Sequence, residues 1–197
     1  MTASFKQKIR EELIVAADLY NKNFLEVDYL IYSKSFQHRT HYFVSAKDDN
    51  FLHLTGVKTS ESPKVFFEKC LSGTLLEEDF DLGNKSQKGS IRRKMSVLKN
   101  ALTIFTGHEI IVEEQFQKNR ISCSFASTDN VCTIGFTKTL LAKPQTVLKG
   151  NILKQAVNVD LIFKKSRDEE SKYKVVYKRG DISEQEAQQL LYDLIQQ

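Results

Sequence analysis

Residues 121–139, ISCSFASTDNVCTIGFTKT, decide the fold class of this chain. Two runs rich in apolar and β-branched residues flank Ser127-Thr128-Asp129-Asn130, and this arrangement predicts two strands joined by a hairpin loop. Similar runs occupy residues 109–117, 146–153, 157–165 and 174–178, with a second hairpin loop expected at residues 167–172. Because the breaks between these runs leave no room for connecting helices, we expect the strands to pair antiparallel.

Helical patterns lie on both sides of this region. Apolar residues recur at three- and four-residue intervals in residues 4–24 and again in residues 90–105. Ser62-Pro63 begins a shorter helix that ends before Gly73. Near the C-terminus, Ser183 and Glu186 have the spacing of a capping box that opens a last helix. The predicted fold class is therefore α+β, with N-terminal helices packed on a mainly antiparallel β-sheet and a C-terminal helix.

The same patterns set the expected organisation of the chain. We expect an N-terminal helix at residues 1–24, a single α+β domain at residues 25–178, and a C-terminal helix at residues 179–197 packed on that domain. Within the domain, residues 29–32 and 41–44 are predicted strands. A polar turn at residues 47–50 leads into residues 51–56, which are expected to form another strand.

Composition excludes several classes of protein. The 197 residues are 41% hydrophobic and 27% charged, which is ordinary for a globular chain and excludes wholesale disorder. No apolar run approaches the roughly 20 residues that cross a bilayer, and the first residues lack an export signal, so we expect a cytoplasmic protein that does not bind membranes. Three cysteines without a CxxC pair suit a reducing compartment. The formal charge of +4 permits a polyanionic partner without requiring one.

Histidines are the candidate proton-transfer groups. Three of the four, His38, His41 and His53, lie close together in the sequence among cationic and hydroxyl side chains, and the fourth is His108. A metal-independent ribonuclease needs this mixture, because a base must take the 2′-hydroxyl proton, an acid must protonate the leaving oxygen, and cations must stabilise the charge on phosphorus. The competing interpretation is structural: His38 as a solvated loop residue, and His41 and His53 as half-buried strand residues. No metal site and no cofactor motif is found.

Basic residues form three further groups with two interpretations each. Arg39 and Lys58 flank the histidines, Arg92 and Lys99 lie on one stripe of the helix at residues 90–105, and Lys164-Lys165 belongs to a strand. All six are candidate nucleic-acid-binding residues, because clustered cations bind phosphates by releasing counterions. A solvated helix face and the protection of a sheet edge are the structural alternatives.

Two neighbouring segments carry a resemblance to a known family. Residues 42–47, YFVSAK, and residues 50–57, NFLHLTGV, resemble the phage-associated branch of the Barnase, EndoU, colicin and RelE-like nuclease superfamily, and weaker similarity extends over residues 25–178. The resemblance implies an α+β nuclease-like domain, encoded by phages, prophages or other mobile elements, that acts on RNA as a toxin or host-directed effector. The motif implies functional roles for His53 and Thr55, with Lys47 just upstream.

These observations support two hypotheses. The first is a metal-independent endoribonuclease of the toxin or effector type, working in the cytoplasm of a host bacterium on RNA or another nucleic acid. In this hypothesis His53 is the general base or acid, His41 is its complement across a hairpin, and Lys47 and Thr55 bind the scissile phosphate. The alternative is a non-catalytic phage effector that binds a host protein or nucleic acid, such as an inhibitor of a bacterial defence complex.

Overall fold

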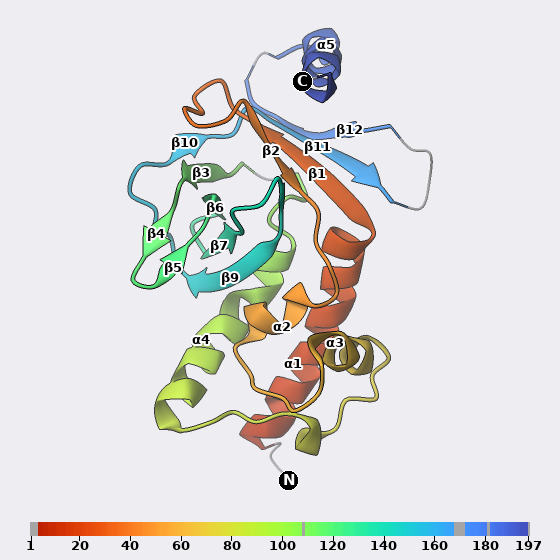
Figure 1. Ribbon diagram of the computed structural model, residues 1–197, viewed down its shortest axis with the longest axis vertical. Helices are drawn as coiled ribbons and strands as arrows, with labels where there is room; N and C mark the ends of the chain where they lie inside the picture. The colour runs from red at the N-terminus through yellow and green to blue at the C-terminus, as the bar shows by residue number, and fades with distance from the viewer. Residues whose placement is uncertain (1–3, 108, 168–171, 181, 197) are drawn as a thin grey trace.

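Residues 4–107, 109–167, 172–180 and 182–196 are described by a computed structural model of the protein. Four helices lie toward one end of the molecule, two five-stranded sheets occupy the middle, and α5 caps the other end (Figure 1). The fold is therefore α+β, as predicted. The α-helices are α1 (Phe5–Tyr20), α2 (Asn50–Thr55), α3 (Pro63–Leu71), α4 (Lys85–Leu102) and α5 (Glu184–Ile195).

Local capping explains where most helices begin. The α1 helix starts after Ser4, whose hydroxyl accepts the Gln7 amide proton, and it continues into a π-helical turn at Asn21–Leu25. The α3 helix starts after Ser62 with proline at its first position, as predicted. The α4 helix starts at Lys85, five residues before the predicted start, because Asn84 forms a capping box there. A short 3₁₀ helix lies between α3 and α4, at Glu77–Asp79.

The strands form two sheets rather than the single predicted sheet. The first sheet has the order β12-β11-β1-β2-β8 and the second β10-β3-β6-β7-β9. Both are antiparallel except for the parallel β2–β8 pair. The strands of the first sheet are β1 (Val27–Tyr32), β2 (His41–Val44), β8 (Leu141–Ala142), β11 (Leu161–Ser166) and β12 (Lys174–Lys178). Those of the second are β3 (Ile111–Glu114), β6 (Phe125–Thr128), β7 (Cys132–Phe136), β9 (Pro144–Lys149) and β10 (Val157–Asn158).

A separate small hairpin joins β3 to β6. Its strands are β4 (Gln117–Lys118) and β5 (Ile121–Ser122), and its turn residue Asn119 has a positive φ of 54°. The hairpin predicted around residues 127–130 is confirmed, but its loop is shifted to residues 129–131, because β6 ends at Thr128 and β7 begins at Cys132. The second predicted loop, at residues 167–172, lies largely outside the described residues.

The main core lies between the N-terminal helices and both sheets. Aromatic rings link the layers: Tyr20 and Phe24 stack at 5.6 Å, Phe24 contacts Phe105, and Phe105 stacks on Phe136 of β7. All four side chains are at most 1% exposed. The side chains of β1 and β11 alternate between the two faces of the first sheet. One face is therefore buried in this core, and the other faces α5.

The C-terminal helix covers the outer face of the first sheet. Ala187, Leu191 and Leu194 pack on a second cluster of buried side chains that comes from β1 and β11 and includes Leu30 and Phe163. The predicted capping box is confirmed: the Ser183 hydroxyl accepts the Glu186 amide, and the Glu186 carboxylate accepts the Ser183 amide. Among the described residues, none of the helices is both apolar and long enough to cross a bilayer.

The strand expected at residues 51–56 is wrong, because these residues form the α2 helix. The side chains of Phe51 and Leu54 are three residues apart and completely buried, which is the spacing of one helix face. Gly56 then ends the helix with a left-handed φ of 78°. A short apolar run fits both periods, and the aromatic cluster around Tyr20 selects the helix by burying Phe51.

Candidate active site

The structure does not bring the two histidines of the sequence hypothesis together. His53 is exposed on α2, and its backbone carbonyl accepts a hydrogen bond from Lys94 Nζ at 3.0 Å. His41 begins β2, and its ring packs edge-on against Phe43 at 4.7 Å on the α5 side of the first sheet. The α2 helix buries its apolar face on the other side of that sheet, so the expected hairpin geometry is wrong. His108 lies outside the described residues.

The other two residues of that hypothesis have local structural contacts. Thr55 is 0% exposed; its hydroxyl donates to the Leu52 carbonyl at 2.8 Å and accepts from the Val57 amide at 3.2 Å. Lys47 is exposed, while its backbone carbonyl accepts the Tyr20 hydroxyl at 2.6 Å. The sequence motif FxHLTG therefore corresponds to a short helix with a buried hydroxyl and a glycine cap.

The predicted nucleic-acid-binding cations lie on different parts of the surface. Arg92 covers the Phe5 ring at 5.0 Å and Lys99 pairs with Glu12 at 3.0 Å, so both attach α4 to α1. Lys164 and Lys165 are consecutive on β11, so their side chains leave opposite faces of the sheet. Lys58 is exposed, and its backbone forms an isolated β-bridge with that of Asp81. Of the six, only Arg39 lines the hollow described below.

The loop between β1 and β2, residues 33–40, is held at several points by the second sheet and by the segment between β10 and β11. The Ser33 hydroxyl donates to the Asn158 carbonyl at 2.7 Å, and the Lys34 amide donates to Asp160 at 2.8 Å. Farther along, the amides of Gln37 and His38 donate to the Glu114 carboxylate, at 2.6 Å and 3.2 Å. These bonds give an otherwise exposed loop a defined course across the edge of β3 and β10.

Glu114, the last residue of β3, also fixes the first buried side chain of β2. Its Oε1 accepts the Tyr42 hydroxyl at 2.7 Å. Tyr42 is 2% exposed, and burial together with this hydrogen bond raises the pKa of its phenol well above the usual range. The phenol consequently keeps its proton at neutral pH and donates it to the carboxylate.

The ring of His38 is oriented by the residue that follows Glu114. Gln115 Nε2 lies 3.1 Å from His38 Nδ1. Gln115 has a φ of 51°, a left-handed conformation that is uncommon for a residue other than glycine. With the amide as donor, Nδ1 accepts and the proton of the neutral imidazole resides on Nε2. A strained backbone at this point thus turns a side chain toward the histidine.

Two hollows meet at His38. One, of about 210 Å³, is lined by His38, Arg39, Tyr42, Gln115, Ser124 and Lys138, and we name it the His38 groove. The other, of about 340 Å³, extends from His38 and Glu114 along Gln155–Val157. The Arg39 guanidinium lies 5.7 Å from the centre of the Tyr42 ring, and Lys138 is exposed on the groove with no ion-pair partner among the described residues. The groove therefore combines an oriented imidazole with two cations.

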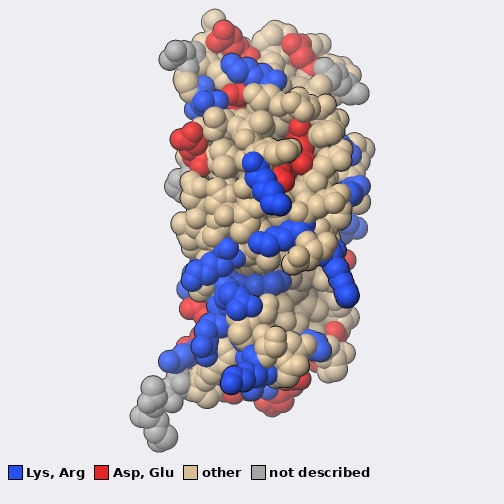
Figure 2. All heavy atoms as spheres, turned by 90° about the vertical axis from the view of Figure 1, so that its left-hand side faces the viewer, with Lys and Arg blue, Asp and Glu red and all other residues tan. Residues whose placement is uncertain are grey.

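A wider cationic surface lies near the groove. Figure 2 shows lysine and arginine gathered over the β4–β5 hairpin and α4, with acidic residues more frequent toward the two ends of this face. Exposed cations of these elements include Lys85, Lys88, Arg93, Lys118 and Arg120. A polyanion held in the groove would find positive charge beyond it.

The sequence singles out His41 and His53 rather than His38 for a physical reason. His38 stands in a polar loop without periodicity, and its partners Glu114, Gln115 and Lys138 are far away in the chain. The sequence around these three partners contains no motif or periodicity that would place them beside a histidine. Among the described residues, no group of three or more His, Cys, Asp or Glu side chains could hold a metal ion.

The chain matches a known protein family. A family model described as phage-Barnase-EndoU-ColicinE5/D-RelE like nuclease4 matches residues 12–192, which is most of the chain and includes every residue of the His38 groove. A search of curated proteins and a search of solved structures found no match.

Proposed function

The chain belongs to the phage-Barnase-EndoU-ColicinE5/D-RelE like nuclease4 family, and from this premise we propose that it is a metal-independent ribonuclease whose active site is the His38 groove. The observation that carries the proposal is the meeting of His38, Arg39 and Lys138 around one hollow. An imidazole titrates near neutral pH, and two cations can stabilise a phosphorane that gains negative charge.

Each group has a distinct role in this proposal. In the tautomer that reacts, the His38 ring carries its proton on Nδ1, where the Gln115 amide, turned so that its oxygen faces the ring, accepts it. The unprotonated Nε2 atom takes the proton from the 2′-hydroxyl as that oxygen attacks phosphorus. The bond from phosphorus to the 5′-oxygen breaks, and the 5′-oxygen takes a proton from the Lys138 ammonium. The products are a 2′,3′-cyclic phosphate and a free 5′-hydroxyl. Arg39 binds the non-bridging phosphate oxygens as a planar donor.

Glu114, Gln115 and Tyr42 act as positioning residues. The Glu114 carboxylate uses its oxygens on the amides of Gln37 and His38 and on the Tyr42 hydroxyl, so these groups hold the loop rather than exchange protons with substrate. A proton-transfer group loses efficiency when it is misplaced by about 1 Å, which makes this support important for catalysis.

Incubation of the purified protein with RNA in EDTA tests the proposal. We expect cleavage that leaves 2′,3′-cyclic ends, and His38→Ala should lower the rate by about 10²- to 10⁴-fold while thermal unfolding stays unchanged. His53→Ala is the matched control because His53 is an exposed histidine on α2, outside the groove. A loss of activity in His53→Ala with full activity in His38→Ala would move the site to α2 and refute the proposal.

The attacking nucleophile also makes RNA the proposed substrate class. An oligonucleotide with a single 2′-deoxy position should resist cleavage there, whereas a DNA strand that is cleaved equally well would contradict the assignment. We further propose that the enzyme acts as a toxin or effector on host RNA in a bacterial cytoplasm. Inducible expression of the wild type should slow bacterial growth and that of His38→Ala should not. Growth arrest by both would favour the non-catalytic effector instead.

A further inference from the structure

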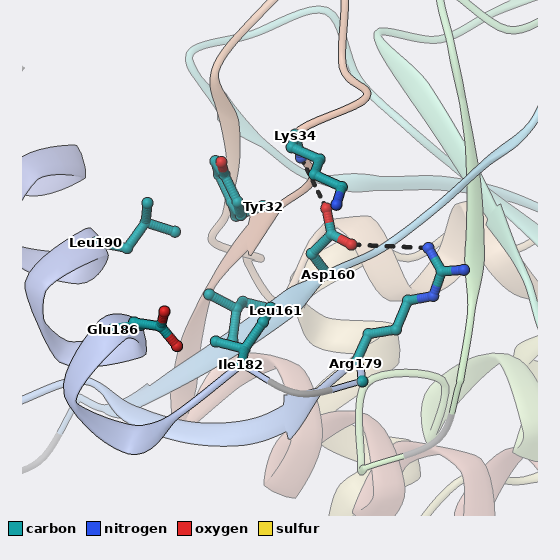
Figure 3. A pocket seen from close by; sticks show the side chains of 9 residues that line it. Tyr32, Lys34, Asp160, Leu161, Arg179, Ile182, Glu186 and Leu190 are labelled. Atoms are coloured by element: carbon teal, nitrogen blue, oxygen red, sulfur yellow. Dashed lines mark hydrogen bonds and ion pairs between the residues drawn. The ribbon is translucent and has the colours of Figure 1, made fainter.

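A separate hollow of about 620 Å³ lies between α5 and the first sheet (Figure 3). One part of its lining is apolar: the Tyr32 ring and Leu161 come from the sheet, and Ile182 and Leu190 come from α5 and the segment before it. Volumes of several hundred Å³ with apolar walls and a few charged groups are typical of sites for small organic molecules. The hollow could therefore accommodate a planar base beside an aromatic ring.

The opposite part of the lining carries two cations with unused donors. Lys34 and Arg179 lie on the side away from Leu190 and Glu186 (Figure 3). The Lys34 ammonium has no ion-pair partner among the described residues. The Arg179 guanidinium reaches the nearby carboxylate of Asp160 through one nitrogen, at 3.8 Å.

Asp160 also lines the hollow, with its carboxylate between Lys34 and Arg179 (Figure 3), and two groups of the β1–β2 loop already donate hydrogen bonds to that carboxylate. Asp160 is 4% exposed, and its Oδ2 accepts the Lys34 amide at 2.8 Å and the Ser33 hydroxyl at 3.4 Å. Most of the N–H groups of Arg179 thus remain available for an anion. Each side of the hollow carries one carboxylate, Asp160 on one and Glu186 on the other, but both cations lie on the Asp160 side (Figure 3). An anionic group is therefore favoured at the Lys34 end over the Glu186 end.

The linings of this hollow, of the 340 Å³ hollow and of the His38 groove follow one another along two chain segments. Tyr32 and Lys34 line the hollow at α5. Ser35, Gln37 and His38 line the 340 Å³ hollow, which we call the intermediate hollow, and His38 also lines the His38 groove. Residues 155–161 follow the same order, because residues 155–157 line the intermediate hollow and Asp160 and Leu161 line the one at α5. Lys34 and His38 are four positions apart in the chain, so their Cα atoms are at most about 14 Å apart.

We propose that the hollow between α5 and the first sheet is a distal nucleotide subsite for the strand that the His38 groove cleaves. A base of that strand stacks on Tyr32 against the apolar wall, and its phosphate binds Lys34 and Arg179. This inference rests on the proposed function, since it requires a nucleic-acid strand in the groove. Base stacking on aromatic side chains and backbone binding by cations are the usual means of holding single strands.

Kinetics on substrates of two lengths tests the subsite. We expect Arg179→Gln and Tyr32→Leu to lower kcat/KM on an oligoribonucleotide of several residues about tenfold and to leave cleavage of a dinucleotide unchanged, because a dinucleotide occupies only the groove. Lys178→Gln is the matched control: it removes the adjacent exposed cation on β12, which does not line the hollow. Equal losses on both substrates, or no loss on the longer one, would overturn the proposal.

Two binding measurements separate the remaining outcomes. If no RNA is cleaved, the catalytic proposal fails, yet binding of a labelled RNA oligonucleotide still tests the subsite: Arg179→Gln should bind more weakly than Lys178→Gln. Equal binding by the two variants would remove the subsite as well. Adenosine monophosphate is the probe for a free nucleotide. If it binds to the hollow as tightly as the oligonucleotide does, the hollow is an independent nucleotide site, and the assignment to the cleaved strand is overturned.

Discussion

The Tyr42 hydroxyl donates a hydrogen bond to Glu114 at 2.7 Å across 72 positions of sequence, and this bond joins the two sheets at the His38 groove. Tyr42 belongs to β2 of the first sheet and Glu114 to β3 of the second. The same carboxylate holds the amides of Gln37 and His38. One side chain thereby sets both the position of the loop that carries the histidine and the spacing of the sheets behind it.

Glu114→Gln should reduce activity without removing a reacting group. The glutamine side chain has one acceptor oxygen, whereas the two oxygens of the Glu114 carboxylate accept three donors. The substitution also removes the charge, and a hydrogen bond to a charged acceptor is worth about 1.5–3 kcal/mol. We expect kcat to fall about tenfold, with faster hydrogen exchange at the amides of Gln37 and His38. Unchanged exchange at these amides would show that Glu114 does not hold the loop.

Substitutions of Lys138 can distinguish its role as a positive charge from its role as a proton donor. Lys138→Arg keeps a cation in the groove, but a guanidinium does not release a proton in proteins. We expect a rate loss of about 10²-fold with little change in KM, and a similar loss in Lys138→Ala accompanied by a higher KM. Full activity of the arginine variant would assign Lys138 to phosphate binding alone and leave the leaving oxygen to be protonated by water.

Thr55→Val should affect stability rather than chemistry. Valine preserves the shape of the buried side chain but leaves the Leu52 carbonyl and the Val57 amide without the hydroxyl, so we expect a loss of about 1–3 kcal/mol in the free energy of unfolding. Chemical denaturation measures this loss. A folded variant with normal stability and no activity would instead restore Thr55 to the catalytic site.

Stability should fall in mild acid because of His41. Burial, together with the charge of Arg39, lowers the pKa of this imidazole below its ordinary value of about 6.5. The unfolded chain therefore binds the proton more readily, so the contribution of the neutral ring is complete above about pH 6.5 and is lost as the pH falls toward the folded-state pKa. Thermal melts from neutral to acid pH should show a steeper loss of stability in the wild type than in His41→Gln. Parallel curves would contradict the assignment.

The cations of the β4–β5 hairpin should contribute to the salt dependence of RNA binding. A plot of log affinity against log salt concentration has a negative slope. Replacing Lys118 and Arg120 with glutamine should make this slope shallower by about 0.7 for each phosphate that the protein no longer neutralises. Glutamine at Lys8 and Lys64, which lie on α1 and α3, serves as the control pair. An equal change of slope in the control pair would assign the effect to net charge rather than to this surface (Figure 2).

Most secondary structure follows from local signals in the chain. The caps at Ser4, Ser62 and Ser183, and the alternation around Asn130, place helices and strands because each depends on residues a few positions apart. Residues 51–56 are the exception. Their apolar run satisfies both periods, and the aromatic core that surrounds Phe51 selects the helix.

Periodicity, capping and local motifs sufficed to predict the α+β class, the positions of most helices and strands, and the family of the chain, because each of these signals lies within a few neighbouring residues. Only the folded chain shows which histidine lines a hollow together with two cations. Folding turned His41 onto Phe43, left His53 on α2, and brought His38 to Glu114, Gln115 and Lys138. Those partners lie on strands and loops far apart in the chain, and only the packing of two sheets against each other sets their distances.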